Sequence, residues 1–325
     1  MLPDWAQPVP YQVKKIAVED AYKAFSNGCR KVAQTGEPFS LSFRSRKDPK
    51  QSCFIPSSAL KATGIYPRIA GELRLSESYP DDARDSRLIC EHGRWFIIVP
   101  YRSNIMPTDN QGRVVALDPG VRTFLSGYAE DMAFKLGEGA FSRIARLCSY
   151  MDDLISRLSQ AKGTKKRSMK RALSRMRWKV WDLIDELHFK SIRFLLDRFD
   201  VILLPTFEVS EMVCKAGRKL RAKSVRSMLS LSHFTFKQRI KAAAQAGGKV
   251  VLDVCEAYTS KTASWTGEIK PIGGAKLIRS DGVTVDRDLN GARGIFLRAL
   301  VDTPSLRNEC ANYSQLLGSV SNCEC

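Results

Sequence analysis

Three acidic residues stand where apolar segments of the chain end or begin, and carboxylates in such places can hold metal ions. Asp118 follows the apolar run VVAL in VVALDPGVRTF, which Pro119 and Gly120 then interrupt. Glu208 follows VILLPTF, and Asp288 opens the segment DLNGARGIFL. Two divalent cations can hold the attacking water and the leaving oxygen of a phosphodiester in line, and Mg²⁺ needs oxygen ligands on rigid elements. Three convergent carboxylates would supply such a site.

Each of these acidic residues also has an ordinary structural interpretation when it is taken alone. Asp-Pro-Gly is a common turn sequence, so a turn role for Asp118 taken alone is favoured over a metal-ligand role by about four to one. Glu208, like Glu211, could lie on the surface at a strand exit, and Asp288 could simply cap a helix. Their joint order along the chain favours metal binding: one carboxylate on the first strand of a meander, one after the fourth strand, and one at the last helix. This is the order of the RuvC, or RNase H-like, nuclease core.

The segments around these residues predict a mixed α/β sheet. Strand-like apolar runs span 113–118, 123–130, 132–137, 200–208 and 249–258. A long helical stretch follows the third run, another helix follows the fourth, and the chain then reaches a last helix with Asp288 as its predicted N-cap. Three antiparallel strands followed by alternating helices and strands indicate such a sheet.

Residues 1–112 predict a separate α+β module. Val13–Phe25 repeats apolar residues at helical spacing, which indicates a helix with one apolar face. Strand-like runs follow at 38–43 and 71–77, and a β-hairpin is predicted at 87–100, where a His-Gly pair separates two apolar strands.

The charge of the chain favours a polyanionic partner, with nucleic acid as the first candidate. Lys and Arg total 52 against 34 Asp and Glu, so the formal net charge is +18. Between Leu154 and Trp181 every charged residue is basic, which favours nucleic acid over a merely solvated helical hairpin by about two to one. The expected contact residues are Lys165, Lys166, Arg167, Lys170, Arg171 and Arg175, with Arg218, Lys219 and Arg221 in a second basic patch.

Several features indicate a soluble, intracellular protein. No apolar run approaches the roughly 18 residues of a membrane span, and the opening MLPDWAQPVP lacks the basic and apolar regions of a signal peptide. The 9 cysteines are mostly scattered singly, so we interpret them as reduced and mostly buried thiols. His188 and His233 are too isolated to predict metal ligands.

Four motifs together resemble the transposon-encoded TnpB nucleases, and most closely their eukaryotic relatives, the Fanzor proteins. The motifs are VVALDPGVRTF, ILLPTFEVSEMV, TSKTASWTGEI and DRDLNGARGIF, and they occur in family order within about residues 8–300. The resemblance implies an RNA-guided DNA endonuclease, with guide RNA and target DNA as partners. It also implies a single RuvC site whose metal ligands are Asp118, Glu208 and Asp288. This site would hold two Mg²⁺ ions, or Mn²⁺ in their place. Asp286 is the nearest competitor to Asp288.

Two departures from the family pattern limit this transfer. In relatives the TSKT segment runs into two Cys-x-x-Cys pairs that bind zinc, whereas this chain has Ala263 and Thr266 and no cysteine there. We therefore expect no structural zinc, and a loop held by packing of Trp265 and Ile269 instead. Relatives also carry a further recognition region before the point where this chain begins, so we expect an incomplete guide-binding lobe.

The predicted fold class is α/β: an RNase H-like (RuvC) core at 113–300 with a helical insertion at about 141–198, after a WED/REC-like α+β module at 1–112. Residues 301–325 are expected to form a loose tail. The leading function is metal-dependent, RNA-directed cleavage of DNA. A catalytically inactive RNA- or DNA-binding protein and an RNA-independent transposase or resolvase stay open as alternatives. The eukaryotic resemblance and the basic segment KKRSMKR favour a nuclear location.

Overall fold

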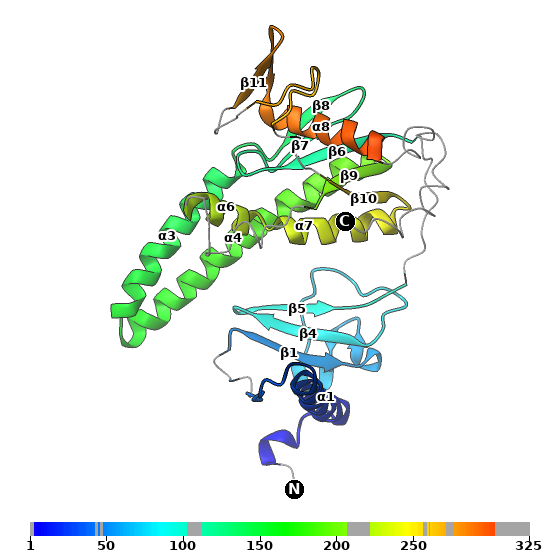
Figure 1. Ribbon diagram of the computed structural model, residues 1–325. Helices are drawn as coiled ribbons and strands as arrows, with labels where there is room; N and C mark the ends of the chain where they lie inside the picture. The colour runs from blue at the N-terminus through cyan, green and yellow to red at the C-terminus, as the bar shows by residue number, and fades with distance from the viewer. Residues whose placement is uncertain are drawn as a thin grey trace. The chain divides into compact units, whose positions relative to one another are not determined.

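The computed structural model describes residues 3–42, 45, 48–102, 112–206, 222–255, 259, 261–270 and 276–302. The chain divides into two compact units, residues 1–103 and 104–325, and each is described by itself (Figure 1). None of the helices within the described ranges is long and apolar enough to cross a membrane.

The first unit is built from one long helix, a three-stranded sheet and short elements between them. The helix is α1 (Tyr11–Thr35), and the antiparallel sheet has the order β1-β4-β5, from β1 (Lys50–Ile55), β4 (Ser86–Glu91) and β5 (Arg94–Ile98). The short elements are η1 (Asp4–Ala6), η2 (Ser57–Ala59), β2 (Leu60–Lys61), β3 (Gly64–Ile65) and α2 (Pro67–Ala70). A small core of Ile55, Ala59 and Ile65 joins the sheet to these short elements.

The predicted hairpin of the first unit is confirmed as β4 and β5. Its turn residues, His92 and Gly93, have φ angles of 46° and 84°, as a two-residue turn between twisted strands requires. The predicted helix is also confirmed and is longer than expected, but none of its side chains is buried.

The strands predicted at 38–43 and 71–77 are wrong for their described residues, which form no strand. Phe39 packs its ring against Phe25 of α1 instead, with 5.9 Å between the ring centroids. The strand that pairs with β4 is β1, which the sequence pattern did not indicate.

The second unit contains a five-stranded mixed sheet of order β10-β9-β6-β7-β8. Its strands are β6 (Val114–Pro119), β7 (Leu125–Tyr128), β8 (Ala133–Leu136), β9 (Val201–Pro205) and β10 (Val250–Val254). β6, β7 and β8 form an antiparallel meander, while β9 runs parallel to both β6 and β10. All five predicted strands and the mixed sheet are confirmed.

Helices cover both faces of this sheet (Figure 1). They are α3 (Ala140–Gln160), α4 (Gly163–Arg198), α6 (Ala222–Leu231), α7 (His233–Ala246) and α8 (Arg287–Asp302). One core joins Val115 and Leu117 of β6 to residues of α3, α4, α6 and α7, and a second core joins Val114 and Ala116 to α8. Since side chains alternate along a strand, Asp118 follows Ala116 on the face that α8 covers.

A two-stranded hairpin precedes α8 and was not predicted. It consists of β11 (Leu277–Ser280) and β12 (Val283–Asp286). Its strands are short and half exposed, so their sequence carries little of the apolar signal that marks a buried strand.

The described cysteines are free thiols, but the expectation that they are mostly buried is wrong. Cys148 is buried, whereas Cys53, Cys90 and Cys255 are half-buried and Cys29 is exposed.

Candidate metal and nucleic-acid site

Asp118 lies against α8, the helix that carries Asp288, on the face of the sheet that α8 covers. Gly291, three residues after Asp288 on α8, lies directly against the carboxylate of Asp118: a Cβ at this glycine would clash with Asp118 Oδ2 and would lie 3.3 Å from its Cγ. Residues three apart in a helix share one face, so Asp288 lies one turn from this contact. The glycine therefore permits a close approach of strand and helix at Asp118, with Asp288 one turn away along α8.

Asp286, the competing acidic residue, caps α8. Its Oδ1 accepts hydrogen bonds from the backbone N–H groups of Asp288 (3.0 Å) and Leu289 (3.3 Å), which is the pattern of an N-cap side chain. The prediction that Asp288 is the N-cap is therefore wrong, because the helix begins at Arg287. Asp288 lies in the first turn, where the helix dipole favours a negative charge.

Lys135 of β8 holds the other oxygen of Asp286. The distance between Lys135 Nζ and Asp286 Oδ2 is 2.7 Å. The hydrogen bond to Asp286 raises the pKa of Lys135 against the opposing effect of burial. Burial opposes ionisation of Asp286, but Lys135 and the backbone donors of the cap outweigh it and lower the pKa of this carboxyl. Both side chains are therefore charged at neutral pH.

Arg287 is a further cation beside Asp288. Its Nη2 atom lies 3.4 Å from Asp288 Oδ1, so the contact is a loose one. The side chain is half-buried rather than fully solvated.

Glu208, the third predicted ligand, lies outside the described residues. The strand that precedes it, β9, ends at Pro205 beside the end of β6, because the parallel register pairs Val114 with Val201 and Ala116 with Leu203. Within the described ranges there is no group of three acidic, His or Cys side chains that could hold a metal ion. The two described carboxylates are hard oxygen donors on a buried strand and a helix, which suits Mg²⁺.

The loop at 261–270 contacts α8 and the β11–β12 hairpin through polar groups. Buried Asn290 of α8 accepts the N–H of Ser264 (2.9 Å) and donates to the carbonyl of Thr262 (2.8 Å). Trp265 Nε1 donates to the carbonyl of Ser280 (3.1 Å). These residues offer no thiolate for zinc.

The packing predicted for this loop is wrong for Ile269, which is 66% exposed. Ser280 Oγ instead donates to Glu268 Oε2 (2.6 Å) and lies 2.9 Å from Thr266 Oγ1. Hydrogen bonds therefore replace the expected apolar contact.

The predicted basic block forms the tip of a helical hairpin made by α3 and α4. The six predicted contact residues on α4 are exposed: Lys165, Lys166, Arg167, Lys170, Arg171 and Arg175. Among the described residues none of the six forms an ion pair with an acidic side chain. Buried Met169 and Leu173 hold this part of α4 in the hairpin. The second predicted patch, with Arg218, Lys219 and Arg221, lies outside the described residues.

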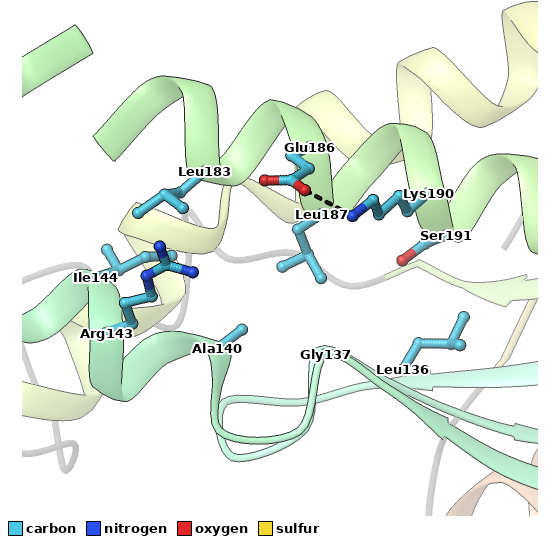
Figure 2. A pocket seen from close by; sticks show the side chains of 10 residues that line it. All are labelled: Leu136, Gly137, Ala140, Arg143, Ile144, Leu183, Glu186, Leu187, Lys190 and Ser191. Atoms are coloured by element: carbon cyan, nitrogen blue, oxygen red, sulfur yellow. Dashed lines mark hydrogen bonds and ion pairs between the residues drawn. The ribbon is translucent and has the colours of Figure 1, made fainter. Parts of the chain in front are cut away.

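A cavity of about 330 Å³ lies between the end of β8, the start of α3 and the middle of α4 (Figure 2). Its lining is mostly aliphatic, and its charged members are Arg143, Glu186 and Lys190. Lys190 Nζ donates to Glu186 Oε1 over 2.6 Å. Leu136 lines the cavity while Lys135 contacts Asp286, so the cavity and the acidic residues lie on opposite faces of β8.

His188 and His233 are buried core residues, as their isolation in the sequence indicates. Both rings stack on Phe124, with centroid distances of 5.2 and 5.0 Å. Burial is the main cause that lowers the pKa of His233 to about 4. The nearby His188 lowers this pKa further, whereas a backbone hydrogen bond with Gly120 raises it. His233 is therefore neutral at pH 7 and packs beneath the turn that follows Asp118.

Comparisons with known proteins agree with the motifs. The family model for the Cas12f1-like TNB domain matches residues 233–295, from α7 into α8. A putative transposase of Paramecium bursaria Chlorella virus 1 is 26% identical over 312 residues, which cover 91% of this chain and 71% of the viral protein. A TnpB-like protein of Acanthamoeba polyphaga mimivirus is 24% identical over 258 residues, which cover 76% of this chain and 47% of the mimivirus protein. A chain in the cryo-EM structure of a Cas12f1–sgRNA–target DNA complex has a TM-score of 0.45 at 13% identity, over 66% of this chain and 45% of that one.

The chain is therefore similar to viral proteins named as transposases or TnpB-like proteins, and its residues 233–295 match a Cas12f1-like domain. Among these relatives are proteins named as TnpB-like, and this similarity agrees with the resemblance carried by the four motifs. The chain spans about half of the mimivirus relative and about half of the Cas12f1 chain.

Lys135, Gly291 and the capping role of Asp286 were missed by the analysis of the sequence. Lys135 interrupts a short apolar strand, AFKL. A charged residue within an apolar strand indicates that its side chain has a specific partner. Its partner lies 151 positions away, so the pairing needs the folded chain.

Proposed function

We propose that the second unit is an RNase H-like nuclease core that cleaves DNA phosphodiester bonds at a divalent-metal site formed by Asp118, Glu208 and Asp288, directed by a bound RNA. The observation that carries this proposal is the contact of Asp118 with Gly291, one helical turn from Asp288. The strand order, a meander followed by two parallel strands, also supports it.

The acidic residues are well placed to hold metal ions without moving. Asp118 is the last residue but one of a strand and follows four buried residues, and Asp288 lies in the first turn of a helix whose later residues pack against that strand. Mg²⁺ bound there would lower the pKa of an attacking water and offset the negative charge that develops on the phosphate. The chain's own contribution is a rigid set of oxygen ligands.

The helical hairpin supplies the backbone contacts that such a reaction needs. Its exposed cations would neutralise phosphates and release counterions, so binding should weaken steeply as salt rises. The protein need not read bases, since a guide RNA would select the target by base pairing. The sgRNA and target DNA named in the Cas12f1 complex support these two partners by analogy.

The direct test is Mg²⁺-dependent DNA cleavage by the purified full chain together with its co-purifying nucleic acid. We expect Asp118→Asn to lower the rate by at least about 10³-fold, because the metal loses one of its ligands. Asp302→Asn is the matched control: Asp302 is an exposed acid at the far end of α8, paired with Arg298 at 3.2 Å, and its loss should leave the rate unchanged. Equal rates for wild type and Asp118→Asn would reject the nuclease proposal in favour of a binding protein.

RNase treatment separates the two nuclease alternatives. Loss of cleavage after RNase supports RNA guidance, and sequencing of the co-purifying RNA would then identify the guide. Unchanged cleavage would support an RNA-independent transposase, the activity in the name of the chlorella virus relative.

A further inference from the structure

Lys135 brings a positive charge to the candidate metal site from the edge of the sheet. Its strand, β8, is an edge strand, and its Nζ lies 2.7 Å from Asp286 Oδ2. The side chains of Lys135 and Asp286 are 25% and 29% exposed, so solvent screens this pair only in part. The ion pair thus ties the edge strand to the residue that caps α8.

Asp286 uses both carboxylate oxygens within the protein. Oδ2 accepts from Lys135, and Oδ1 accepts from the N–H groups of Asp288 and Leu289. The backbone is also fixed here, because the N–H of Arg287 donates to the carbonyl of Lys276 (2.9 Å). Asp286 therefore acts as an anchor of the helix rather than as a free ligand for a metal ion.

The direction of Asp288 depends on this anchor. Asp288 is the second residue of α8, and its own N–H is one of the two donors that the cap holds. Since Asp288 and Gly291 share a helix face, a change in the first turn would turn Asp288 away from the point where Gly291 meets Asp118.

We propose that Lys135 is a positioning residue of the metal site: through its ion pair with Asp286 it fixes the first turn of α8, so that Asp288 faces Asp118. This inference rests on the proposed function, because it concerns the same site. Two physical effects of Lys135 predict opposite results. If Lys135 acted only as a charge, its removal would strengthen cation binding by Coulomb's law, whereas loss of positioning weakens binding.

Binding of Mn²⁺ to the full chain, freed of nucleic acid at high salt, tests this inference without any cleavage assay. Electron paramagnetic resonance of free Mn²⁺ gives the dissociation constant directly. We expect Lys135→Met to weaken Mn²⁺ binding by about tenfold, the usual effect of losing a residue that orients a metal ligand. Lys135→Arg keeps the ion pair and should restore the affinity to within about threefold of wild type.

A second variant protects the test against a simple folding defect. Asp286→Ser keeps a side-chain oxygen that can cap α8 but loses the ion pair, and it should weaken binding to the same degree as Lys135→Met. The double variant should be no weaker than either single one, because both changes remove one interaction. Lys241→Met, which breaks the pair of Lys241 with Asp253 (2.8 Å) away from the site, should bind Mn²⁺ like wild type.

The outcomes separate this inference from the proposed function. If wild type and Asp118→Asn bind Mn²⁺ alike, the proposed metal site is wrong. If binding needs Asp118 but Lys135→Met binds as tightly as wild type or more tightly, the site stands and the positioning role of Lys135 is overturned.

Discussion

Acidic side chains stand at both ends of the parallel strands β6 and β9, and their surroundings differ. At the start of β9, Asp200 is 1% exposed and lies 3.5 Å from Lys249 Nζ and 3.8 Å from Arg113 Nε. At the opposite end, Asp118 and Asp288 are half-buried, and the lysine of that region, Lys135, is engaged by Asp286 instead.

Under the proposed function, one residue type performs two tasks in one sheet. Asp200 accepts the backbone N–H of Arg113 (3.1 Å), while Lys249 also donates to the carbonyl of Phe199 (2.9 Å), so this acid and its cations join β6, β9 and the start of β10. The negative charge of Asp200 is thus offset by cationic side chains of the protein itself. At the other end Lys135 and the cap of α8 engage Asp286, and the proposed function assigns Asp118 and Asp288 to a metal ion from solution.

The largest expected effect comes from breaking the buried pair. Asp200→Ala should lower the free energy of unfolding by about 3 to 5 kcal/mol, because it leaves Lys249 buried without its partner. Urea denaturation measures this change. Asp302→Ala, which removes an exposed acid, should change the stability by less than about 0.5 kcal/mol. A loss below about 1 kcal/mol for Asp200→Ala would show that the pair is not structural.

The buried histidine beneath the acid end should make the stability depend on pH. The pKa of His233 is about 4 in the folded chain, below its ordinary value of 6.5, so the unfolded chain binds more protons between these values. The stabilisation is therefore complete above about pH 6.5 and should fall by about 3 kcal/mol as the pH drops to 4.

Urea denaturation of wild type and His233→Gln at pH 7 and pH 4 isolates this contribution from other titrating groups. The variant should lose about 3 kcal/mol less than wild type over this interval. His188, whose pKa is lowered mainly by burial, is present in both proteins, so its own contribution cancels in the difference; only its repulsion of a protonated His233 disappears in the variant. Parallel pH profiles for the two proteins would contradict the assignment.

The basic hairpin should show its effect in the salt dependence of nucleic-acid binding. Replacing Lys166, Lys170 and Arg171 together by Gln should reduce the slope of log affinity against log salt by about 0.7 to 0.9 for each phosphate that the protein no longer neutralises. Fluorescence anisotropy with labelled duplex and single strands measures the slope. Lys190→Gln, where the lysine is already paired with Glu186, is the control and should keep the wild-type slope.

The smallest expected change is in the stability of Asp288→Asn. This substitution should alter the free energy of unfolding by no more than about 1 kcal/mol, the usual value of a charge in the first turn of a helix. The same variant should lose cleavage activity, in contrast to Asp200→Ala, which should lose stability. A destabilisation as large as that of Asp200→Ala would mean that both ends serve the fold alone.

Much of the sheet could be predicted because its strands are contiguous apolar runs between clear breaks. VVAL and VILLP are buried throughout, so their composition alone marks them. The hairpin before α8 gave no such signal, because Leu277 and Val283 are exposed and its strands are fixed by contacts with the loop at 261–270.

The site itself could be predicted only in part. The motif order selected Asp118 and Asp288, but the sequence DRD offers two acids two positions apart, and only the cap geometry assigns Asp286 to the helix. The contact with Gly291 and the pair with Lys135 join segments far apart in the chain, which a single sequence does not encode locally.

The most direct test of the central claim replaces Mg²⁺ by Fe²⁺ and generates hydroxyl radicals with ascorbate and peroxide, which cut the backbone only near the bound ion. Fragments of the full chain should end near residues 118, 208 and 288 together, should disappear when excess Mg²⁺ competes, and should be absent from Asp118→Asn. Cuts near one of these positions alone, or cuts that persist in Asp118→Asn, would contradict a metal site shared by the three acids.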